Sequence, residues 1–255
     1  TGVWLFFAIS GYVVTLSVIR WPATAAWPGL VAFFRRRFLR ILPVYYLYVG
    51  LGLLFMASLG ASANPVALRS LLGFYNNMAM VFGHGEFADW PVGHLWTISV
   101  EMQFYVVYGV ALFALRRKYT IAILSCMLAA APVLRFFVSS RLQQAGWSDL
   151  DAAYAIYAGS FLHVDSFALG SLLAFANMRG LLKRIARPLA VAGLCMLLTY
   201  VAAYAYINSV ELGRSGINVF RDIVSGILYG QKREVFVYSA LAFASAGLIS
   251  LAATG

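Results

Sequence analysis

Apolar runs long enough to cross a lipid bilayer recur from one end of this 255-residue chain to the other, and they limit its fold more than any other feature. A helix needs about 20 consecutive apolar residues to span the hydrocarbon core of a bilayer. The composition agrees, because 62% of the residues are hydrophobic and only 11% are charged, whereas soluble domains carry about 25% charged residues. A transmembrane β-barrel would instead alternate polar and apolar residues. The sequence therefore predicts an all-α fold, a polytopic bundle of transmembrane helices.

We expect about seven spans in a single integral-membrane domain that covers residues 1–255. One further segment, residues 65–82, is only half apolar and carries Arg69, Asn76 and Asn77. It is therefore predicted to be re-entrant or interfacial rather than spanning. The predicted spans are residues 3–19, 41–59, 95–115, 119–138, 153–176, 189–208 and 235–254.

The net charge of +10 could indicate a nucleic-acid partner, but the positions of the basic residues indicate a membrane protein. Basic clusters flank the apolar runs, as the positive-inside rule predicts. With these clusters in the cytoplasm, the inner segments hold twelve basic residues and no acidic ones, and the outer segments, to which Arg135 is assigned, hold seven of each. We therefore predict a lipid bilayer, and no nucleic acid, as the partner. The inner loops are then 20–40, 116–118 and 177–188, and the outer loops 60–93, 139–152 and 209–234.

This orientation makes the first span run from outside to inside, directly after Thr1 and without an initial Met or a basic leader. An inward-running first span normally follows an outward-running span or a cleaved export signal. We therefore expect the sequence to be a piece of a longer protein that is incomplete at its N-terminus.

Two ionisable residues, His94 and Glu101, stand in the otherwise apolar stretch "HLWTISVEMQFY". On a helix, with 100° between successive residues, they share one polar stripe with Thr97, Tyr105 and Tyr108. Glu101 then lies roughly 10 Å deeper in the membrane than His94. A charge at that depth is costly unless it is paired or hydrated, so the stripe should face a cavity or a partner helix. The alternative is a protonated Glu101 that hydrogen-bonds to a neighbouring span.

The stretch around Glu101 resembles the "WSLSVE-x-QFY" signature of acyltransferase family 3, a family of integral-membrane enzymes that O-acylate sugars and other extracytoplasmic acceptors. Three further stretches are similar to motifs of that family. "FFAISGYV" from Phe6 is similar to "FFxLSGF", "RRFLRILPVYY" from Arg36 to "RxxRIxPxY", and "HVDSFALGSLLAF" from His163 to "RxDxLLxGxLLA". His163 stands where the family usually has Arg. The resemblance covers most of residues 4–175.

The resemblance implies an O-acyltransferase that moves an acyl group, with acetyl expected, from acyl-CoA to a hydroxyl of a sugar or cell-surface polysaccharide. Acyl-CoA is then the donor substrate, and no bound cofactor and no metal are expected. The family's catalytic histidine lies in a first span that has no counterpart in this sequence. The catalytic candidates here are Glu101, which would orient that histidine or place the acceptor, and His94. The implied location is the inner (plasma) membrane of a bacterium.

Arg37 and Arg40 are the candidates for binding the donor. Because they are three positions apart on a helix, they share a face at the predicted cytoplasmic mouth. Guanidinium groups suit the phosphates of coenzyme A, since they form bidentate, charge-assisted hydrogen bonds. For Arg35 and Arg36, chain orientation and contacts with anionic lipid explain the charge. Pro43 is expected at the start of the following span.

The predicted span 153–176 carries one stripe of small and polar residues, namely Gly159, His163, Ser166 and Gly170. Such a stripe predicts close helix packing, with His163 in an interhelical hydrogen bond. Asp165 points to another face and is expected to pair with an arginine of another span. The candidates for a substrate-binding or structural role are therefore Tyr105, His163 and Asp165.

Two alternatives to the acyltransferase remain open. A proton-coupled transporter would use Glu101, Asp165 and His163 as a proton relay or substrate path. An inactive fragment that lacks its catalytic helix is the second alternative. A metal site is not expected, because the spacing of the four candidate loop ligands matches no established pattern. These residues are His84, Glu86, Asp89 and His94.

Overall fold

The computed structural model describes residues 2–19, 21, 26–83, 85, 87, 89–221, 223 and 233–254. This described part is 84% helical and contains no strand, and seven of its helices are long and apolar enough to cross a membrane. The predicted all-α fold with about seven spans is confirmed. The spans are Gly2–Ile19, Trp27–Ser58, Gly93–Ala114, Arg117–Gln144, Ser160–Met178, Leu182–Glu211 and Val235–Ala252.

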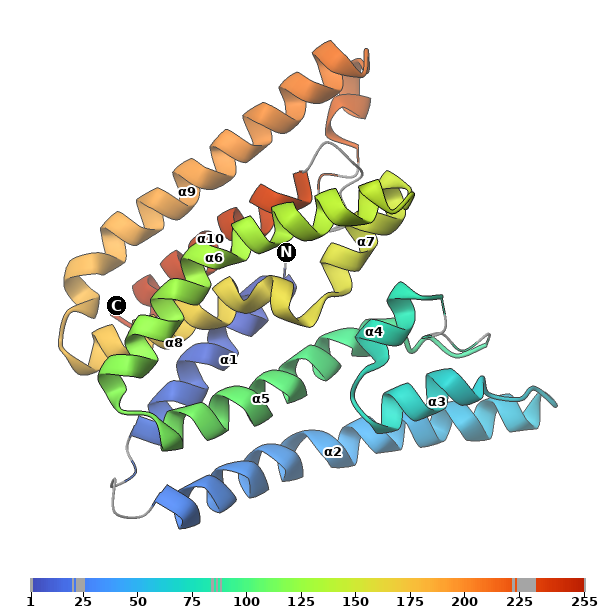
Figure 1. The fold of residues 1–255 in the computed structure, drawn as a ribbon, viewed down its shortest axis with the longest axis horizontal. Helices are drawn as coiled ribbons and strands as arrows, with labels where there is room; N and C mark the ends of the chain where they lie inside the picture. Colours follow the sequence, from blue (N-terminus) through green and yellow to red (C-terminus); the bar gives the residue numbers. More distant parts are fainter. Residues whose placement is uncertain are drawn as a thin grey trace. The chain divides into compact units, whose positions relative to one another are not determined.

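The chain forms two compact units. Unit 1 comprises residues 1–16, 118–157 and 161–255, and unit 2 comprises residues 17–117 and 158–160. The helices of unit 2 (Figure 1) are α2 (Ala26–Ser58), α3 (Pro65–Leu72), α4 (Asn76–Val81), η2 (Gly93–Leu95) and α5 (Trp96–Ala114). Unit 1 contains most of α1 (Gly2–Ile19), α6 (Arg117–Gln144), α7 (Asp149–Ala158), η3 (Ser160–His163), α8 (Val164–Met178), α9 (Leu182–Tyr206), η4 (Ile207–Glu211), η5 (Gly216–Phe220) and α10 (Arg233–Ala252).

The helix α2 is longer than predicted and includes Arg35, Arg36, Arg37 and Arg40, which together are called the arginine motif below. It runs for 33 residues, roughly 50 Å, whereas the hydrocarbon core of a bilayer is about 30 Å thick. The prediction of a loop over residues 20–40 is therefore wrong from Ala26 onward. The prediction that Pro43 starts a span is also wrong, because Pro43 lies inside the helix. Proline removes one backbone hydrogen bond, but helices packed in membrane proteins tolerate that loss.

The seam between α2 and α5 is built from aromatic rings that lie against glycines of the other helix. A Cβ atom on Gly29 would lie 2.7 Å from the ring of Phe113, and one on Gly109 would lie 2.7 Å from the ring of Phe33. The α2 positions rise by four while the α5 positions fall by four, so the two helices are antiparallel, as Figure 1 shows. The next turn along this seam carries the arginine motif on α2.

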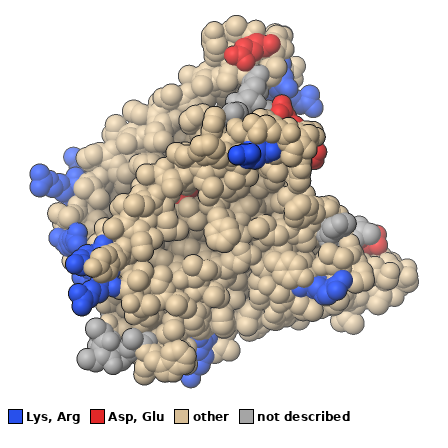
Figure 2. Space-filling model, in the orientation of Figure 1, with Lys and Arg blue, Asp and Glu red and all other residues tan. Residues whose placement is uncertain are grey.

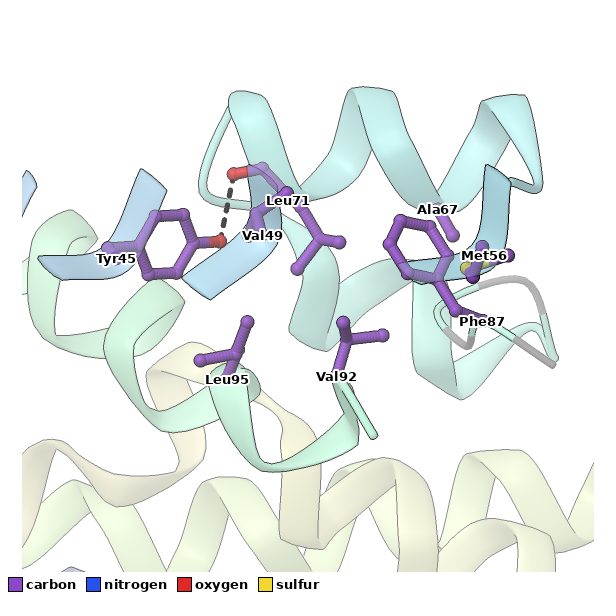
Figure 3. Close-up of a cluster of buried hydrophobic side chains, with 8 residues drawn as sticks. All are labelled: Tyr45, Val49, Met56, Ala67, Leu71, Phe87, Val92 and Leu95. Carbon is purple, nitrogen blue, oxygen red and sulfur yellow. Dashed lines mark hydrogen bonds between the residues drawn. The ribbon is translucent and has the colours of Figure 1, made fainter. Parts of the chain in front are cut away.

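The segment predicted to be re-entrant or interfacial folds into the two short helices α3 and α4, neither of which is long enough to span a membrane. It packs on α2 and on the start of α5 through one hydrophobic cluster, shown in Figure 3. Within this cluster the Tyr45 hydroxyl donates to the carbonyl oxygen of Leu71 over 2.9 Å, which ties α3 to α2. The cluster comprises Tyr45, Val49, Met56, Ala67, Leu71, Phe87, Val92 and Leu95.

In unit 1, α1 and α8 cross with their backbones in direct contact. A Cβ atom on Gly170 would lie 1.9 Å from the carbonyl oxygen of Ala8, and one on Gly11 would lie 2.2 Å from that of Phe167. No side-chain atom fits at such distances, so both positions require glycine. This agrees with the predicted close packing at Gly170, and it is how small residues bring membrane helices together.

Replacing Gly170 with Ala is expected to lower the stability of the protein by about 3 kcal/mol, the upper end of the cost of overpacking, because backbone atoms cannot move aside for the new methyl group. The matched control is Gly50→Ala in α2, where a Cβ meets nothing within 4 Å and alanine favours the helix. Thermal unfolding of the purified protein in detergent measures both effects. A Gly170→Ala variant that melts with the wild type would contradict the close crossing.

The predicted span 153–176 is interrupted in the structure. The helix α7 ends at Ala158, the 3-10 turn η3 follows, and α8 begins at Val164. Gly159 lies in this break, so the prediction that it shares a helical stripe with Ser166 and Gly170 is wrong. The helical segment of this region that is long and apolar enough to cross a membrane is Ser160–Met178.

The basic cluster predicted in an inner loop at 177–188 instead surrounds a tight turn between helices. The helix α8 ends at Met178 and α9 begins at Leu182, and Gly180 between them has a φ of +68° that favours glycine. Most of the predicted loop is therefore helical. On the face drawn in Figure 2, the Lys and Arg side chains gather at helix ends, and the helix walls between them are largely uncharged.

Candidate functional site

The predicted polar stripe begins just before α5, with His94. The helix starts at Trp96, so His94 lies in the turn η2 and not on the helix itself. The His94 side chain is exposed, and its ring packs edge-on against Tyr48 of α2 with 5.3 Å between centroids. Glu101 lies seven residues further along the chain, roughly 10 Å away at helical rise. The structure therefore does not bring the two catalytic candidates, His94 and Glu101, into contact.

Glu101 is buried within unit 2, with 4% of its surface exposed. The hydroxyl of Tyr105, one helical turn further along α5, donates a hydrogen bond to Glu101 Oε1. Residues four apart on a helix are neighbours on its surface. The sequence placed both residues on one stripe, but it did not predict the hydrogen bond between them. Tyr108, also on the predicted stripe, is buried and its ring stacks on that of Phe104 at 4.7 Å.

Arg37 is half-buried against aromatic rings at the seam between α2 and α5. Its guanidinium carbon lies 5.4 Å from the centroid of the Tyr105 ring and 5.9 Å from that of the Phe33 ring. A cation is attracted to the face of such rings. Since Tyr105 also hydrogen-bonds to Glu101, the structure brings a candidate for donor binding and a catalytic candidate to the same tyrosine.

The other arginines of this cluster have different surroundings. Arg35, Arg36 and Arg40 are exposed, and the guanidinium carbon of Arg36 lies 5.5 Å from the centroid of the Trp21 ring. Aromatic and basic side chains of this kind are typical of the membrane–water interface. The two members of the predicted donor-binding pair thus differ, because Arg37 is held by rings and Arg40 is open to its surroundings.

In unit 1, His163 is fully buried and both of its ring nitrogens are hydrogen-bonded. Trp4 Nε1 donates to His163 Nδ1 over 3.2 Å, and His163 Nε2 lies 2.8 Å from the carbonyl oxygen of Tyr157. Because Trp4 can only donate, Nδ1 accepts and Nε2 carries the proton. The predicted interhelical hydrogen bond of His163 is confirmed. Its ring also packs edge-on against Tyr238, with 4.9 Å between centroids.

Asp165 forms a fully buried ion pair with Arg135 of α6. Arg135 Nη2 lies 2.7 Å from Asp165 Oδ2, and Ser239 of α10 bonds to both partners. Arg135 Nη1 and Nε donate to the carbonyl oxygens of Leu162 and Val235, respectively. The expected pairing of Asp165 with an arginine of another span is confirmed. The assignment of Arg135 to an outer segment is wrong, because Arg135 lies inside α6 and joins it to η3, α8 and α10.

Sequence reasoning missed a second polar network, which lies in unit 2. Gln103 Nε2 donates to the carbonyl oxygen of Phe74 over 2.7 Å and to Asn77 Oδ1 over 3.1 Å. Asn77 Nδ2 in turn donates to the carbonyl oxygen of Ala158 and to Ser160 Oγ, over 3.0 and 2.7 Å. Phe74 has a φ of +56°, which is strained for a bulky residue. Two signals were available in the sequence, because Gln103 belongs to the same motif as Glu101 and Asn77 is one of the polar residues noted in the segment 65–82.

Among the described residues, no group of three or more His, Cys, Asp or Glu side chains gathers in a way that could hold a metal ion. His84 and Glu86, two of the four loop residues considered as ligands, lie outside the described residues.

Comparison with known proteins adds a family and several distant relatives. Residues 1–254 match the family model described as "Acyltransferase domain". The O-acetyltransferase OatA of Staphylococcus aureus (strain NCTC 8325 / PS 47) is 23% identical over 189 residues, which cover 68% of this chain and 29% of OatA. A provisionally named O-acetyltransferase, SACOL0978, of S. aureus (strain COL) is 26% identical over 185 residues, 68% of this chain and 30% of that protein. The chain thus spans less than a third of these relatives, and no solved structure matches it.

Proposed function

We propose that this protein transfers an acyl group to a hydroxyl of its acceptor. The premise is that the chain belongs to the acyltransferase family, whose model it matches over residues 1–254. The chain is an integral-membrane protein with seven apolar helices among its described residues. The proposed donor is acyl-CoA, with acetyl as the acyl group, and the proposed acceptor is a sugar or cell-surface polysaccharide. The proposed location is a bacterial inner membrane. The S. aureus relatives named as O-acetyltransferases support the choice of acyl group.

The observation that carries this proposal is the contact chain from Arg37 through Tyr105 to Glu101 in unit 2. Arg37 and the exposed Arg40 would bind the phosphates of coenzyme A, because guanidinium groups match phosphate oxygens bidentately. Glu101, buried one turn from Tyr105, would orient the general base or the acceptor hydroxyl. His94 is exposed before the start of α5, and its proposed role is to meet the acceptor there.

The proposed reaction is attack of the acceptor's hydroxyl oxygen on the carbonyl carbon of the thioester. A carbon–oxygen ester bond forms, the carbon–sulfur bond breaks, and coenzyme A leaves as its thiol. The general base takes the proton of the hydroxyl group and returns one to the leaving sulfur. A buried carboxylate that holds the base in a single orientation lowers the cost of reaching this geometry.

The transporter alternative is less well supported by the contacts in unit 1. A proton relay needs groups that exchange protons with a pathway. Asp165 is held by the Arg135 guanidinium and by Ser239, and both ring nitrogens of His163 are engaged. These contacts favour a structural role for both residues.

Arg37→Ala in the full-length protein is expected to raise the KM for acyl-CoA by about 10- to 100-fold, because hydrogen bonds to charged groups contribute about 1.5–3 kcal/mol. Coenzyme A release by the purified, reconstituted protein with a polysaccharide acceptor is the measurement, and Arg40→Ala should act in the same direction. Arg35→Ala is the control, since Arg35 is an exposed arginine of the same helix but is not one of the two proposed donor-binding residues. Equal increases in KM for Arg35→Ala and Arg37→Ala would mean that bulk charge, not a phosphate site, explains the cluster.

A further inference from the structure

We infer that Tyr105 is a positioning residue for two groups of the proposed site. Its ring positions Arg37, which would bind the donor, and its hydroxyl positions Glu101, which would act in the reaction. The face of its ring lies under the guanidinium group of Arg37, and its hydroxyl donates to the carboxyl group of Glu101. The inference rests on the proposed function. It adds that donor binding depends on the ring of Tyr105, whereas turnover depends on its hydroxyl.

The ring carries the first part of the inference. An arginine side chain has many rotamers, and a fixed guanidinium group binds a phosphate better than a mobile one. The guanidinium group of Arg37 lies against two rings, those of Phe33 and Tyr105, which themselves meet edge to face with 6.3 Å between centroids. Phe33 is itself fixed, because it is buried and lies against Gly109. Tyr105 thus supplies the second of the two rings that restrict the position of the Arg37 guanidinium group.

The hydroxyl carries the second part. A carboxyl group inside a membrane span needs a hydrogen-bond donor, and Tyr105 supplies one from the next turn of the same helix. This bond restricts the orientation of the Glu101 carboxyl group relative to α5. The cation above the ring also draws electron density from the phenol, which strengthens the hydroxyl as a donor. Arg37 and Glu101 are therefore linked electrostatically without touching each other.

Other tyrosines of unit 2 lie in different surroundings. The hydroxyl of Tyr45 donates to the backbone carbonyl of Leu71, and that of Tyr48 to the carbonyl of Pro91 over 2.8 Å. Both bonds hold loops and short helices on α2 and involve no carboxylate. Tyr45 is as buried as Tyr105, which makes it a matched control for the loss of one buried hydroxyl.

The test compares Tyr105→Phe with Tyr105→Leu in the full-length protein. Tyr105→Phe keeps the ring and loses the hydroxyl, so kcat should fall about 10-fold or more while the KM for acetyl-CoA stays within about twofold. Tyr105→Leu loses both parts, so the KM should also rise about 10-fold. Equilibrium binding of coenzyme A to the purified variants should show the same division without any turnover.

A double variant sharpens the test. If the hydroxyl acts only through Glu101, then Tyr105→Phe/Glu101→Gln should be no slower than Glu101→Gln alone. The control Tyr45→Phe should leave kcat per folded protein unchanged. A wild-type kcat in Tyr105→Phe, or independent losses in the double variant, would overturn the inference and leave the proposed function intact. A wild-type protein that neither binds coenzyme A nor releases it from acetyl-CoA would overturn the proposed function, and the inference with it.

Discussion

Replacing Glu101 with Gln is expected to lower the turnover of acyl transfer by about 10²- to 10⁴-fold, the range typical of acid–base partners, while the protein stays folded. Glutamine keeps the shape of the side chain and removes the carboxylate. If Glu101 were only a packing residue, an amide would replace most of its hydrogen bonds, including acceptance from Tyr105, and the variant would be nearly silent. The size of the loss therefore separates a catalytic role from an architectural one.

The measurement is acyl transfer to the acceptor by full-length protein at matched levels of folded enzyme. Glu101→Asp is the companion variant, because it keeps the charge but withdraws it by one methylene group, and it should retain more activity than Glu101→Gln. Near-wild-type turnover in Glu101→Gln would mean that this carboxyl group has only a structural role. The proposed function would then depend on the arginine motif alone.

The second large effect is expected in unit 1, where Arg135→Met should lower stability by about 3–5 kcal/mol. Arg135 and Asp165 are both fully buried, and among the described residues the carboxylate keeps Ser239 Oγ and the Ser166 backbone N–H as its donors once the guanidinium is gone. An uncompensated buried charge is costly, because neither water nor a counter-ion reaches it. Thermal unfolding in detergent, together with the monodisperse fraction after purification, measures the loss.

Two further variants make this prediction specific to the ion pair. Arg141→Met removes an exposed arginine from the same helix, α6, and should change stability by less than about 0.5 kcal/mol. Arg135→Met/Asp165→Asn removes both charges and should recover much of the stability lost in Arg135→Met. A double variant as unstable as Arg135→Met would contradict the ion-pair explanation, since the loss would then come from the packing of the arginine side chain.

The membrane spans and their order could be predicted because they depend on local composition. Backbone groups inside the bilayer must be hydrogen-bonded within the protein, which leaves helices and closed β-barrels. The continuous apolar runs lack the alternation of a barrel strand, so helices remain. The same logic identified residues 65–82 as too polar to span, and they form two short helices. Periodicity was enough to place Glu101 and Tyr105 on one helix face, four residues apart, although the hydrogen bond between them was not predicted.

Helix ends were predicted less well, because hydropathy does not report where a helix stops. The helix α2 continues through four arginines and past Pro43, since its backbone hydrogen bonds form equally well outside the hydrocarbon core. In the predicted span 153–176, the apolar composition gave no sign that the helix is interrupted at Gly159. Asn77, whose side chain bonds to the carbonyl of Ala158 and to Ser160, comes from a segment more than 80 positions earlier.

The sequence alone determined that this chain is a helical membrane protein, which family it resembles, and which ionisable residues need an explanation. The tertiary structure decided what those residues do. Arg135 looked like an outer charge until partners about 30 and 100 positions away in the chain enclosed it. The sequence already separated Arg37 and Arg40 from Arg35 and Arg36, but Arg37 differed from Arg40 only once α5 placed the Tyr105 ring against it. A charged residue in a membrane is defined by its partners, and partners from distant helices are brought together only by folding.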